Sequence, residues 1–441
     1  MKYYSTNKKA PLASLKRAVI KGLAGDKGLY MPENIDLMKD FVIGEMKNMT
    51  FQEISCVIAR ALFGDDVDGD TLDRIVKDTI SFDAPIVHLH DNIYCLELFH
   101  GPTMAFKDVG ARFMARLLAY FIDKEGVKDV NVLVATSGDT GSAVANGFLG
   151  MEGINVYVLY PKGKVSAIQE CQFATLGRNI TTLEIDGTFD DCQAIVKAAF
   201  MDEEMNEHSK LTSANSINVA RFLPQSFYYF YAYAQLDKIG KADNLVISVP
   251  SGNFGNLAAG LFAHWMGLPV KRFIAANNRN DVFLDYLRTG RYKSRPSVST
   301  LANAMDVGDP SNFARITDLF SIYPNPYAAI LKRISGYSYT DEVIAATMRQ
   351  VYRRYGYVLD PHGACGYEAL SEERQAYELA KIETGLFLET AHPAKFKASV
   401  DTILGVNLDV PDKLRSFMEG EKQSISLSRD FEGFKRYFLS R

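Results

Sequence analysis

The stretch VNVLVATSGDTGS, residues 130–142, joins a short apolar run to a turn made of small and polar residues. Its first part, Val130–Ala135, is almost entirely apolar, which is typical of a strand buried on both faces of a parallel sheet. The polar part, Thr136–Ser142, leads into a stretch with helical spacing. A strand, a turn and a helix in this order predict one unit of an α/β fold.

The same alternation recurs along the chain. Further short apolar runs are separated by stretches long enough for a crossover helix. These runs are Ile154–Tyr160, Ile180–Ile185, Leu245–Val249, Arg272–Ala276 and Leu386–Glu389. The pattern predicts doubly wound, mostly parallel sheets, in which ligands bind beyond the carboxyl ends of the strands.

The length predicts more than one packed unit, since 441 residues is about three times a ~150-residue domain. Residues 1–90 carry helix-period apolar positions and predict a mainly helical N-terminal domain. Residues 91–403 predict the α/β core, with 130–215 as a small mobile subdomain and 277–340 as an insertion rich in breakers. Residues 404–441 are expected to form a surface segment.

Composition limits the classes of function. Lysine and arginine number 49 against 53 acids, for a net charge of −4, which disfavours a generally basic nucleic-acid surface. No apolar run reaches the ~18 residues of a membrane-spanning helix. The five cysteines contain no C-x-x-C pair, which favours a reducing compartment. The basic segment before Asp26 is interpreted as a helix of the fold rather than a targeting peptide, because Lys16 and Arg17 interrupt its apolar centre.

The stretch LELFHGPTMAFKD, residues 96–108, places a lysine at the start of a predicted helix. Gly101-Pro102 predicts a turn, and helically spaced apolar residues continue to about Phe121. Lys107 is therefore expected in the first helical turn, where the helix dipole and partial burial both lower the pKa of its amine. A neutral amine suits a nucleophile that forms a Schiff base. A lysine that extends into solvent is the alternative.

The stretch VPSGNFGN, residues 249–256, follows a predicted strand and opens a helix. A glycine-rich turn at a helix N-terminus suits a phosphate monoester, because backbone N–H groups and the helix dipole attract the anion. Neither G-x-G-x-x-G nor G-x-x-x-x-G-K-[ST] occurs in the chain, which disfavours dinucleotide-binding and Walker-type sites.

Two further polar stretches are candidates for anion binding. Thr136–Ser142 has more hydroxyls and glycines than a helix cap requires, which favours a ligand site over a plain capped turn. SANSINVAR, residues 213–221, offers amide, hydroxyl and guanidinium groups that suit an anionic substrate. Helix capping by Asn215 or Ser216 is the alternative and, from these residues alone, the better one. The aromatic run Phe227–Tyr231 is interpreted as core.

Neither a metal site nor a serine-hydrolase site is predicted. His88 and His90 stand two residues apart, and the chain contains no H-E-x-x-H and no G-x-S-x-G. His362 and His392 are expected at loop positions with structural roles.

Together these motifs resemble the bacterial and fungal form of the threonine synthase family, pyridoxal-phosphate enzymes of the tryptophan synthase β-subunit superfamily. The resemblance begins at Gly28-Leu29-Tyr30-Met31-Pro32 and runs nearly to the end of the chain. Its motifs, in order, are LELFHGPTMAFKD (96–108), ATSGDTGSA (135–143), SANSINVAR (213–221), VPSGNFGN (249–256), NAMDVGDPSN (303–312) and TAHPAKF (390–396). The resemblance implies two fold type II α/β domains.

The resemblance also implies roles for particular residues. Lys107 would carry pyridoxal 5'-phosphate as an internal aldimine, and Thr390 would face its pyridine nitrogen. The cofactor phosphate would rest on Gly252, Asn253, Phe254, Gly255 and Asn256. The substrate carboxylate would bind at Thr136, Ser137, Asp139 and Thr140, with Asp139 near the phenolic oxygen of the ring. The substrate phosphate would bind at Asn215, Ser216 and Arg221. His362 receives no role, because Gly363 beside it stands where the family usually has alanine.

The activity implied is that of a carbon–oxygen lyase acting on phosphates. O-phospho-L-homoserine and water would give L-threonine and phosphate by γ-elimination and β-addition of water. The alternatives are a phospho-lyase or threonine dehydratase-type enzyme that releases 2-oxobutyrate, a nucleotide-dependent protein that uses Ser251–Asn256, and a cofactor-binding module without activity. A cytoplasmic monomer or homodimer, with neither nucleic acid nor membrane as partner, is expected.

Overall fold

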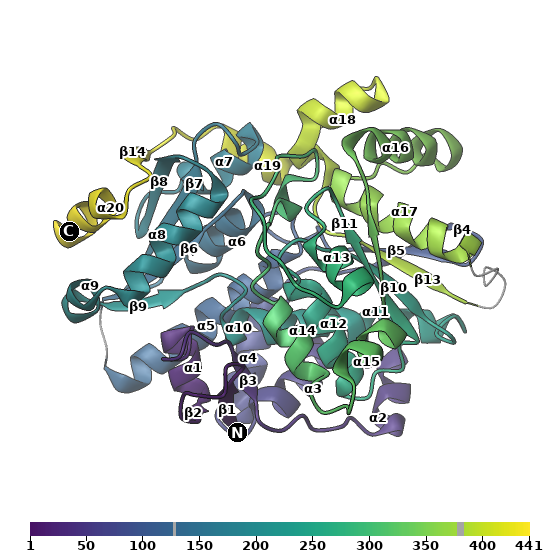
Figure 1. Ribbon diagram of the computed structural model, residues 1–441, viewed down its shortest axis with the longest axis horizontal. Helices are drawn as coiled ribbons and strands as arrows, with labels where there is room; N and C mark the ends of the chain where they lie inside the picture. Colours follow the sequence, from purple (N-terminus) through teal and green to yellow (C-terminus); the bar gives the residue numbers. More distant parts are fainter. Residues whose placement is uncertain (127–128, 377–382) are drawn as a thin grey trace. The chain divides into compact units, whose positions relative to one another are not determined.

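The structure is a computed structural model, and it describes residues 1–126, 129–376 and 383–441 (Figure 1). The chain folds into two compact units. Unit 1 comprises Met1–Glu33, Lys107–Arg221 and Val410–Arg441, and unit 2 comprises Asn34–Phe106 and Phe222–Asp409. The predicted domain limits at residues 90 and 403, and the mobility of residues 130–215, stay predictions.

Unit 1 is built on a five-stranded, all-parallel sheet in the order β14-β8-β7-β6-β9 (Figure 1). The strands are β6 (Val130–Ala135), β7 (Ile154–Pro161), β8 (Ile180–Asp186), β9 (Lys210–Ser213) and β14 (Ser424–Ser428). The three predicted strands in this unit, β6, β7 and β8, are confirmed. They are buried along nearly their whole length, as a covered parallel strand requires, and β6 and β7 are mostly apolar.

Helices and a small N-terminal sheet complete unit 1. The helices are α1 (Leu15–Lys21), α5 (Lys107–Glu125), α6 (Asp139–Phe148), α7 (Ala167–Ala174), α8 (Phe189–Met201), α9 (Glu203–His208), α10 (Val219–Phe222), α19 (Asp412–Met418) and α20 (Phe431–Leu439). The small sheet is antiparallel and consists of β1 (Lys2–Ser5), β2 (Ala13–Ser14) and β3 (Tyr30–Pro32).

The C-terminal segment differs from the expected surface structure. Its strand β14 pairs in parallel with β8, and Phe434 and Phe438 of α20 are buried in the core of unit 1. The burial of these two rings contributes stability of about 2 kcal/mol each. The segment is therefore an integral part of the unit.

Unit 2 is built on a six-stranded sheet in the order β12-β11-β10-β13-β5-β4, which is parallel except for the edge strand β4. The strands are β4 (Ile86–His90), β5 (Ile93–Glu97), β10 (Val246–Pro250), β11 (Arg272–Asn277), β12 (Ile334–Ser338) and β13 (Gly385–Glu389). The predicted strands β10, β11 and β13 are confirmed, so the α/β fold class with mostly parallel sheets is confirmed in both units.

Helices cover the sheet of unit 2 and form most of its N-terminal part. They are α2 (Asp40–Glu45), α3 (Phe51–Phe63), α4 (Gly69–Thr79), α11 (Ser226–Lys238), α12 (Gly255–Trp265), α13 (Val282–Thr289), α14 (Phe313–Leu319), α15 (Pro326–Arg333), α16 (Asp341–Tyr355), α17 (Pro361–Ala376) and α18 (Lys397–Leu404). In Figure 1, α16 and α17 run beside the strands of this sheet, and α17 packs directly on β10, β11 and β13. The predicted helices at Phe51–Leu62 and Leu72–Ile80 correspond to α3 and α4.

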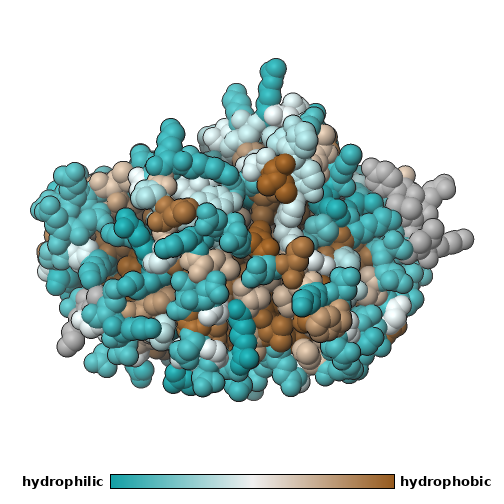
Figure 2. All heavy atoms as spheres, turned by 90° about the horizontal axis from the view of Figure 1, so that it is seen from below, coloured by the Kyte–Doolittle hydropathy of each residue, from teal (hydrophilic) through white to brown (hydrophobic). Residues whose placement is uncertain are grey.

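Hydrophobic side chains also reach the surface. Figure 2 shows one face on which they gather in small groups among hydrophilic residues. Leu37, Phe41 and Ile322 are among the large hydrophobic residues that are mostly exposed. In the described part of the chain, no helix has both the length and the apolar character needed to cross a membrane.

Candidate active site

Three neighbouring strands of unit 2 end in predicted cofactor-binding segments. β13 pairs in parallel with β10 on one side and with β5 on the other, so their carboxyl ends lie at one edge of the sheet. β10 is followed by the 251–256 turn, β13 by Thr390, and β5 by the segment 98–106 that leads to Lys107. This is the edge at which α/β sheets bind ligands.

The 251–256 turn has an unusual backbone. Phe254 precedes α12 with a φ of 61°, a left-handed conformation that is uncommon outside glycine. Its ring is buried and lies 4.6 Å from that of Phe283, centroid to centroid, which anchors the turn. A Cβ atom at Gly252 would come within 2.5 Å of Met305 Cα, so only glycine fits at this place.

Three residues from other elements hold this turn. Asn277 Nδ2 donates to the Ser251 carbonyl at 2.7 Å, and Asn312 Nδ2 donates to the Asn253 carbonyl at 3.0 Å. The Tyr229 hydroxyl lies 2.7 Å from Asn256 Oδ1. The sequence does not predict these three residues as members of the site. Its pattern predicts that Tyr229 is a core residue and that Asn277 interrupts regular secondary structure.

The turn leaves hydrogen-bond donors unused. Within the described residues, no side chain caps α12, so the N–H groups of its first turn lack the usual partner. The Nδ2 atom of Asn256 is buried and likewise has no partner there. A buried amide without a partner costs free energy. An anion with several acceptor oxygens would satisfy these donors.

Thr390 lies at the end of β13, and its backbone organises the segment that precedes Lys107. The Thr390 carbonyl accepts the Phe106 N–H at 2.9 Å, and the Met104 carbonyl accepts the His392 N–H at 3.0 Å. The Tyr228 hydroxyl donates to the Phe106 carbonyl at 2.8 Å. The Thr390 hydroxyl donates to no group in the described parts of the chain, so it is available to a ligand.

Lys107 is the first residue of α5 and is partly exposed. Its place at the helix N-terminus agrees with the sequence prediction. The lowered pKa of its amine stays a prediction. Phe106, the residue before Lys107, is hydrogen-bonded to Thr390 and Tyr228.

The 136–141 turn of unit 1 follows β6 and opens α6. Thr136 Oγ1 accepts the N–H groups of Gly138 at 2.9 Å and Gly141 at 2.7 Å. The hydroxyls of Ser137 and Thr140 belong to partly exposed residues and contact no hydrogen-bonding group among the described residues. Two free hydroxyls in one turn suit a carboxylate.

Asp139 is a buried member of the same turn. It is 3 % exposed, and the side-chain amide of Gln169 donates to its Oδ1 at 2.8 Å. Gly138 has a φ of 139°, and a Cβ there would meet the Gln169 side chain within 2.7 Å. Asp139 therefore ties the turn to α7, and its predicted place near the cofactor ring stays a prediction.

The predicted phosphate ligands of the substrate make internal contacts. The side-chain amide of Asn215 donates to the Ala135 carbonyl at 2.8 Å and accepts the Ala135 N–H at 3.2 Å. Arg221 is 1 % exposed, and its guanidinium donates to the Ala214 carbonyl. Burial lowers the pKa of Arg221 to about 10, while the nearby Asp108 opposes this shift. These contacts fix the segment after β9, and the ligand roles of Asn215, Ser216 and Arg221 stay predictions.

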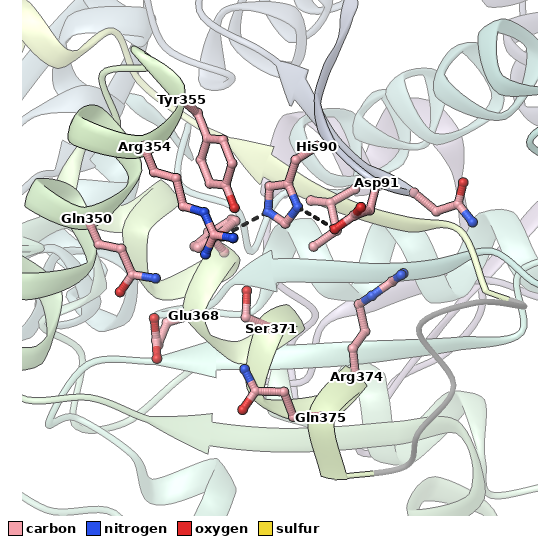
Figure 3. Close-up of a pocket in the computed structure, with 12 residues that line it drawn as sticks. His90, Asp91, Gln350, Arg354, Tyr355, Glu368, Ser371, Arg374 and Gln375 are labelled. Carbon is pink, nitrogen blue, oxygen red and sulfur yellow. Dashed lines mark hydrogen bonds and ion pairs between the residues drawn. The ribbon is translucent and has the colours of Figure 1, made fainter.

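A cavity of about 820 Å³ lies elsewhere in unit 2 (Figure 3). It is bounded by the turn before β5 and by the C-terminal halves of α16 and α17, with His90, Arg354, Tyr355 and Arg374 in its wall. His90 bonds to Asp91 and to the Tyr367 hydroxyl, at 3.0 and 2.9 Å. Since Ile93 begins β5, this cavity is at the amino end of the strand, opposite the edge that carries Thr390.

Comparison with known proteins agrees with this architecture. The profile "Pyridoxal-phosphate dependent enzyme" matches residues 78–389, "Threonine synthase N terminus" matches 2–80, and "Threonine synthase, C-terminal" matches 363–437. The threonine synthase of Haemophilus influenzae is 44 % identical over 439 residues, with all of both chains covered. This chain belongs to the threonine synthase family.

Solved structures of the family superpose on the whole chain. The crystal structure of threonine synthase from Escherichia coli has a TM-score of 0.93 at 43 % identity, with both chains fully covered. The structure of pyridoxal-phosphate-bound threonine synthase from Brucella melitensis has a TM-score of 0.90 at 33 % identity, covering 100 % of this chain and 99 % of the other. As a member of the threonine synthase family, the chain is a pyridoxal-phosphate-dependent enzyme.

The residues present fit this cofactor. Pyridoxal phosphate carries a dianionic phosphate, and the 251–256 turn offers an uncapped helix N-terminus and the unpartnered Asn256 amide. Gly252 lets the turn pack against Met305, and Phe254 takes a left-handed conformation directly before α12. The threonine synthase family and its cofactor, both inferred from sequence motifs, are thus confirmed.

Proposed function

We propose that this protein converts O-phospho-L-homoserine and water to L-threonine and inorganic phosphate. One observation carries the proposal. Three adjacent strand ends of one sheet bear the turn suited to a phosphate, the free Thr390 hydroxyl and the segment that leads to Lys107, in a chain that matches threonine synthases along its full length.

The cofactor's place follows from the chemistry of these groups. The N–H groups of Gly255 and Asn256, with the Asn256 amide, would hold the cofactor phosphate, and the Lys107 amine would hold its aldehyde carbon. Thr390 would present a hydroxyl, rather than a carboxylate, to the ring nitrogen. A hydroxyl does not stabilise a protonated ring nitrogen as a carboxylate does.

Bound pyridoxal phosphate supplies an electron sink that stabilises negative charge on substrate carbon atoms. In the proposed reaction the Nζ atom of Lys107 takes the proton from the substrate α-carbon and returns protons later. Ser137 and Thr140 hold the substrate carboxylate through their hydroxyls. Asn215, Ser216 and Arg221 receive the substrate phosphate, because amide, hydroxyl and guanidinium groups suit phosphate oxygens.

Product analysis tests the proposal. Purified protein supplied with pyridoxal phosphate and O-phospho-L-homoserine is expected to release threonine and inorganic phosphate in equal amounts. Lys107→Ala should lower kcat by at least about 10³-fold, because it removes both the covalent anchor and the base. Release of 2-oxobutyrate instead of threonine would identify a lyase and reject the proposed water addition.

Three further points of the proposal concern the whole molecule. We infer a small-molecule substrate, a cytoplasmic location and a monomeric or homodimeric state. Fractionation of cells and light scattering of the purified protein test the last two.

A further inference from the structure

A chain of buried polar groups lies behind Thr390 in unit 2. Glu389 ends β13, and Asp360 and His362 flank the first residue of α17. All three are at most 1 % exposed. Placing an ionisable group in the interior is costly, so a buried set of three needs an explanation.

The three side chains are linked in series. The Asp360 N–H donates to Glu389 Oε1 at 2.5 Å, so the start of α17 is tied to the Glu389 carboxyl group. Asp360 Oδ1 accepts the His362 N–H at 2.6 Å and lies 2.5 Å from His362 Nδ1. His362 Nε2 accepts the Ala304 N–H at 3.2 Å, so the imidazole proton is on Nδ1 and is donated to Asp360.

The series joins two segments that face the cofactor in the proposed site. At one end, Glu389 precedes Thr390 directly, and Asp360 Oδ2 accepts the Ala391 N–H at 3.4 Å. At the other end, the backbone of Ala304 and Met305 packs against Gly252 of the 251–256 turn. The polar chain therefore spans from the segment expected at the ring to the turn expected at the phosphate.

The Glu389 carboxyl group holds a proton. Two neighbouring carboxylates do not both ionise in a buried site. Asp360 Oδ1 accepts the backbone N–H and the imidazole N–H of His362, whereas Glu389 accepts a single N–H from the described residues. Burial and the neighbouring acids raise the pKa of Glu389 well above its usual range. No donor reaches Glu389 Oε2 from the described residues, which leaves this oxygen to carry the proton.

The groups that face Glu389 support this assignment. They are Asp360 before α17, Cys95 and Glu97 on β5, and Tyr357 from the segment before Asp360. Burial raises the pKa of the Cys95 thiol and of the Tyr357 phenol, so both are neutral at physiological pH. The two acids, Asp360 and Glu97, both disfavour a second negative charge.

Gly363 is matched to this arrangement. A Cβ atom at residue 363 would overlap Glu389 Oε2, so any side chain there displaces the carboxyl group. A glycine at this position thus has a physical reason in this chain. It gives room to the protonated acid.

We propose that protonated Glu389 is a positioning residue that accepts the Asp360 N–H and, through Asp360 and His362, holds the segment around Thr390 and the 251–256 turn in fixed positions. The proposal rests on the roles assigned above to Thr390 and Gly252. It concerns residues that touch neither cofactor nor substrate.

The pH dependence of stability tests whether Glu389 holds a proton in the native state. Above pH ~4.5 the unfolded chain releases the Glu389 proton that the native state keeps, so stability falls as pH rises until the pH passes the native pKa. Glu389→Gln removes this titration. We expect the unfolding constant of the cofactor-free wild type, relative to the variant, to rise up to about tenfold per pH unit between pH 5 and 7 in urea titrations. Parallel pH profiles would overturn the assignment of the proton.

Cofactor binding tests the positioning role. A glutamine keeps the size of the side chain, and its carbonyl oxygen can accept the Asp360 N–H, so Glu389→Gln should bind pyridoxal phosphate within about threefold of the wild type at pH 7. Glu389→Ala and His362→Phe should bind it about tenfold more weakly or worse, with unchanged far-ultraviolet circular dichroism. Wild-type affinity in both of these variants would reject the positioning role.

A matched control separates this role from the loss of any buried acid. Glu373 of α17 is equally buried but accepts from Arg272 at 2.6 Å and from the Tyr337 hydroxyl at 2.7 Å. Glu373→Gln should lower stability and leave the cofactor affinity unchanged. An equal loss of affinity in Glu373→Gln would overturn the specific role of Glu389. If the wild type itself bound no pyridoxal phosphate, the proposed site would fail, while the pH comparison would still decide where the proton lies.

Discussion

Two turns of this protein have the same topology but differ in whether their backbone N–H groups are hydrogen-bonded within the protein. The 251–256 turn in unit 2 and the 136–141 turn in unit 1 each connect a buried parallel strand to a helix. In the 136–141 turn, Thr136 Oγ1 takes two backbone N–H groups of its own turn. In the 251–256 turn, no side chain of the described residues caps the helix, and the Asn256 amide nitrogen has no partner.

The difference lies in where each turn obtains its rigidity. The 251–256 turn is held from outside, by Asn277, Asn312 and Tyr229 on other elements, and its own donors stay available. The 136–141 turn is held from within, and it offers hydroxyls rather than backbone N–H groups. The 251–256 turn therefore suits an anion with many acceptor oxygens, whereas the 136–141 turn suits a smaller carboxylate.

The largest effect is expected from the internal acceptor of the 136–141 turn. Thr136→Val keeps the shape of the side chain and leaves two buried N–H groups without a partner. Each unpaired group costs about 1–3 kcal/mol, so the free energy of unfolding should fall by about 2–6 kcal/mol. Urea denaturation of the cofactor-free protein measures the loss.

Ser251→Ala is the matched control in the other turn. The Ser251 hydroxyl donates to the Val249 carbonyl at 2.8 Å and supports no N–H group of the turn. Its removal should cost about 0.5–1.5 kcal/mol. Equal losses in the two variants would show that the turns do not differ as described.

A smaller effect, on cofactor affinity, is expected from Gly252→Ala. The added Cβ would meet Met305 Cα and displace the 251–256 turn, and overpacking of this kind costs about 1–3 kcal/mol. Pyridoxal phosphate should therefore bind about 10- to 100-fold more weakly in an absorbance titration. Gly141→Ala makes a similar clash with Thr136 in the other turn, and it should leave the cofactor affinity close to that of the wild type. Equal weakening by both would contradict the separate roles of the two turns.

How much the sequence predicts differs between central and edge strands. Six strands are predicted within about one residue of their observed limits, because strands buried on both faces are apolar throughout. In the two large sheets, β4, β9, β12 and β14 are not among these six, and all four lie at sheet edges. An edge strand is partly open to solvent, so its residues alternate or include serine and glycine, as in the SISLS of β14. The apolar central strand β5 is also missed, since its last residues belong to the motif that leads to Lys107.

The candidate site shows a similar limit. Motifs predict the turns, Lys107 and Thr390, because glycine, hydroxyl and amine groups have local chemical meaning. The groups that hold these segments are distant in sequence, as with Tyr229 and Asn256, or Asp360 and Glu389. A single sequence contains no signal for such pairs, apart from the polar character of residues in otherwise apolar surroundings.

The smallest effect is expected at the free hydroxyls of the 136–141 turn. Ser137 and Thr140 contact no described hydrogen-bonding group, so their removal should leave the stability of the protein almost unchanged. If they bind the substrate carboxylate, Ser137→Ala and Thr140→Val should each cost about 0.5–1.5 kcal/mol of binding, a 2- to 12-fold rise in KM for O-phospho-L-homoserine. Steady-state kinetics at saturating pyridoxal phosphate measures this rise, and the cofactor affinity of each variant is the control. An unchanged KM in both variants would remove the 136–141 turn from substrate binding, and its internal hydrogen bonds would then serve the fold alone.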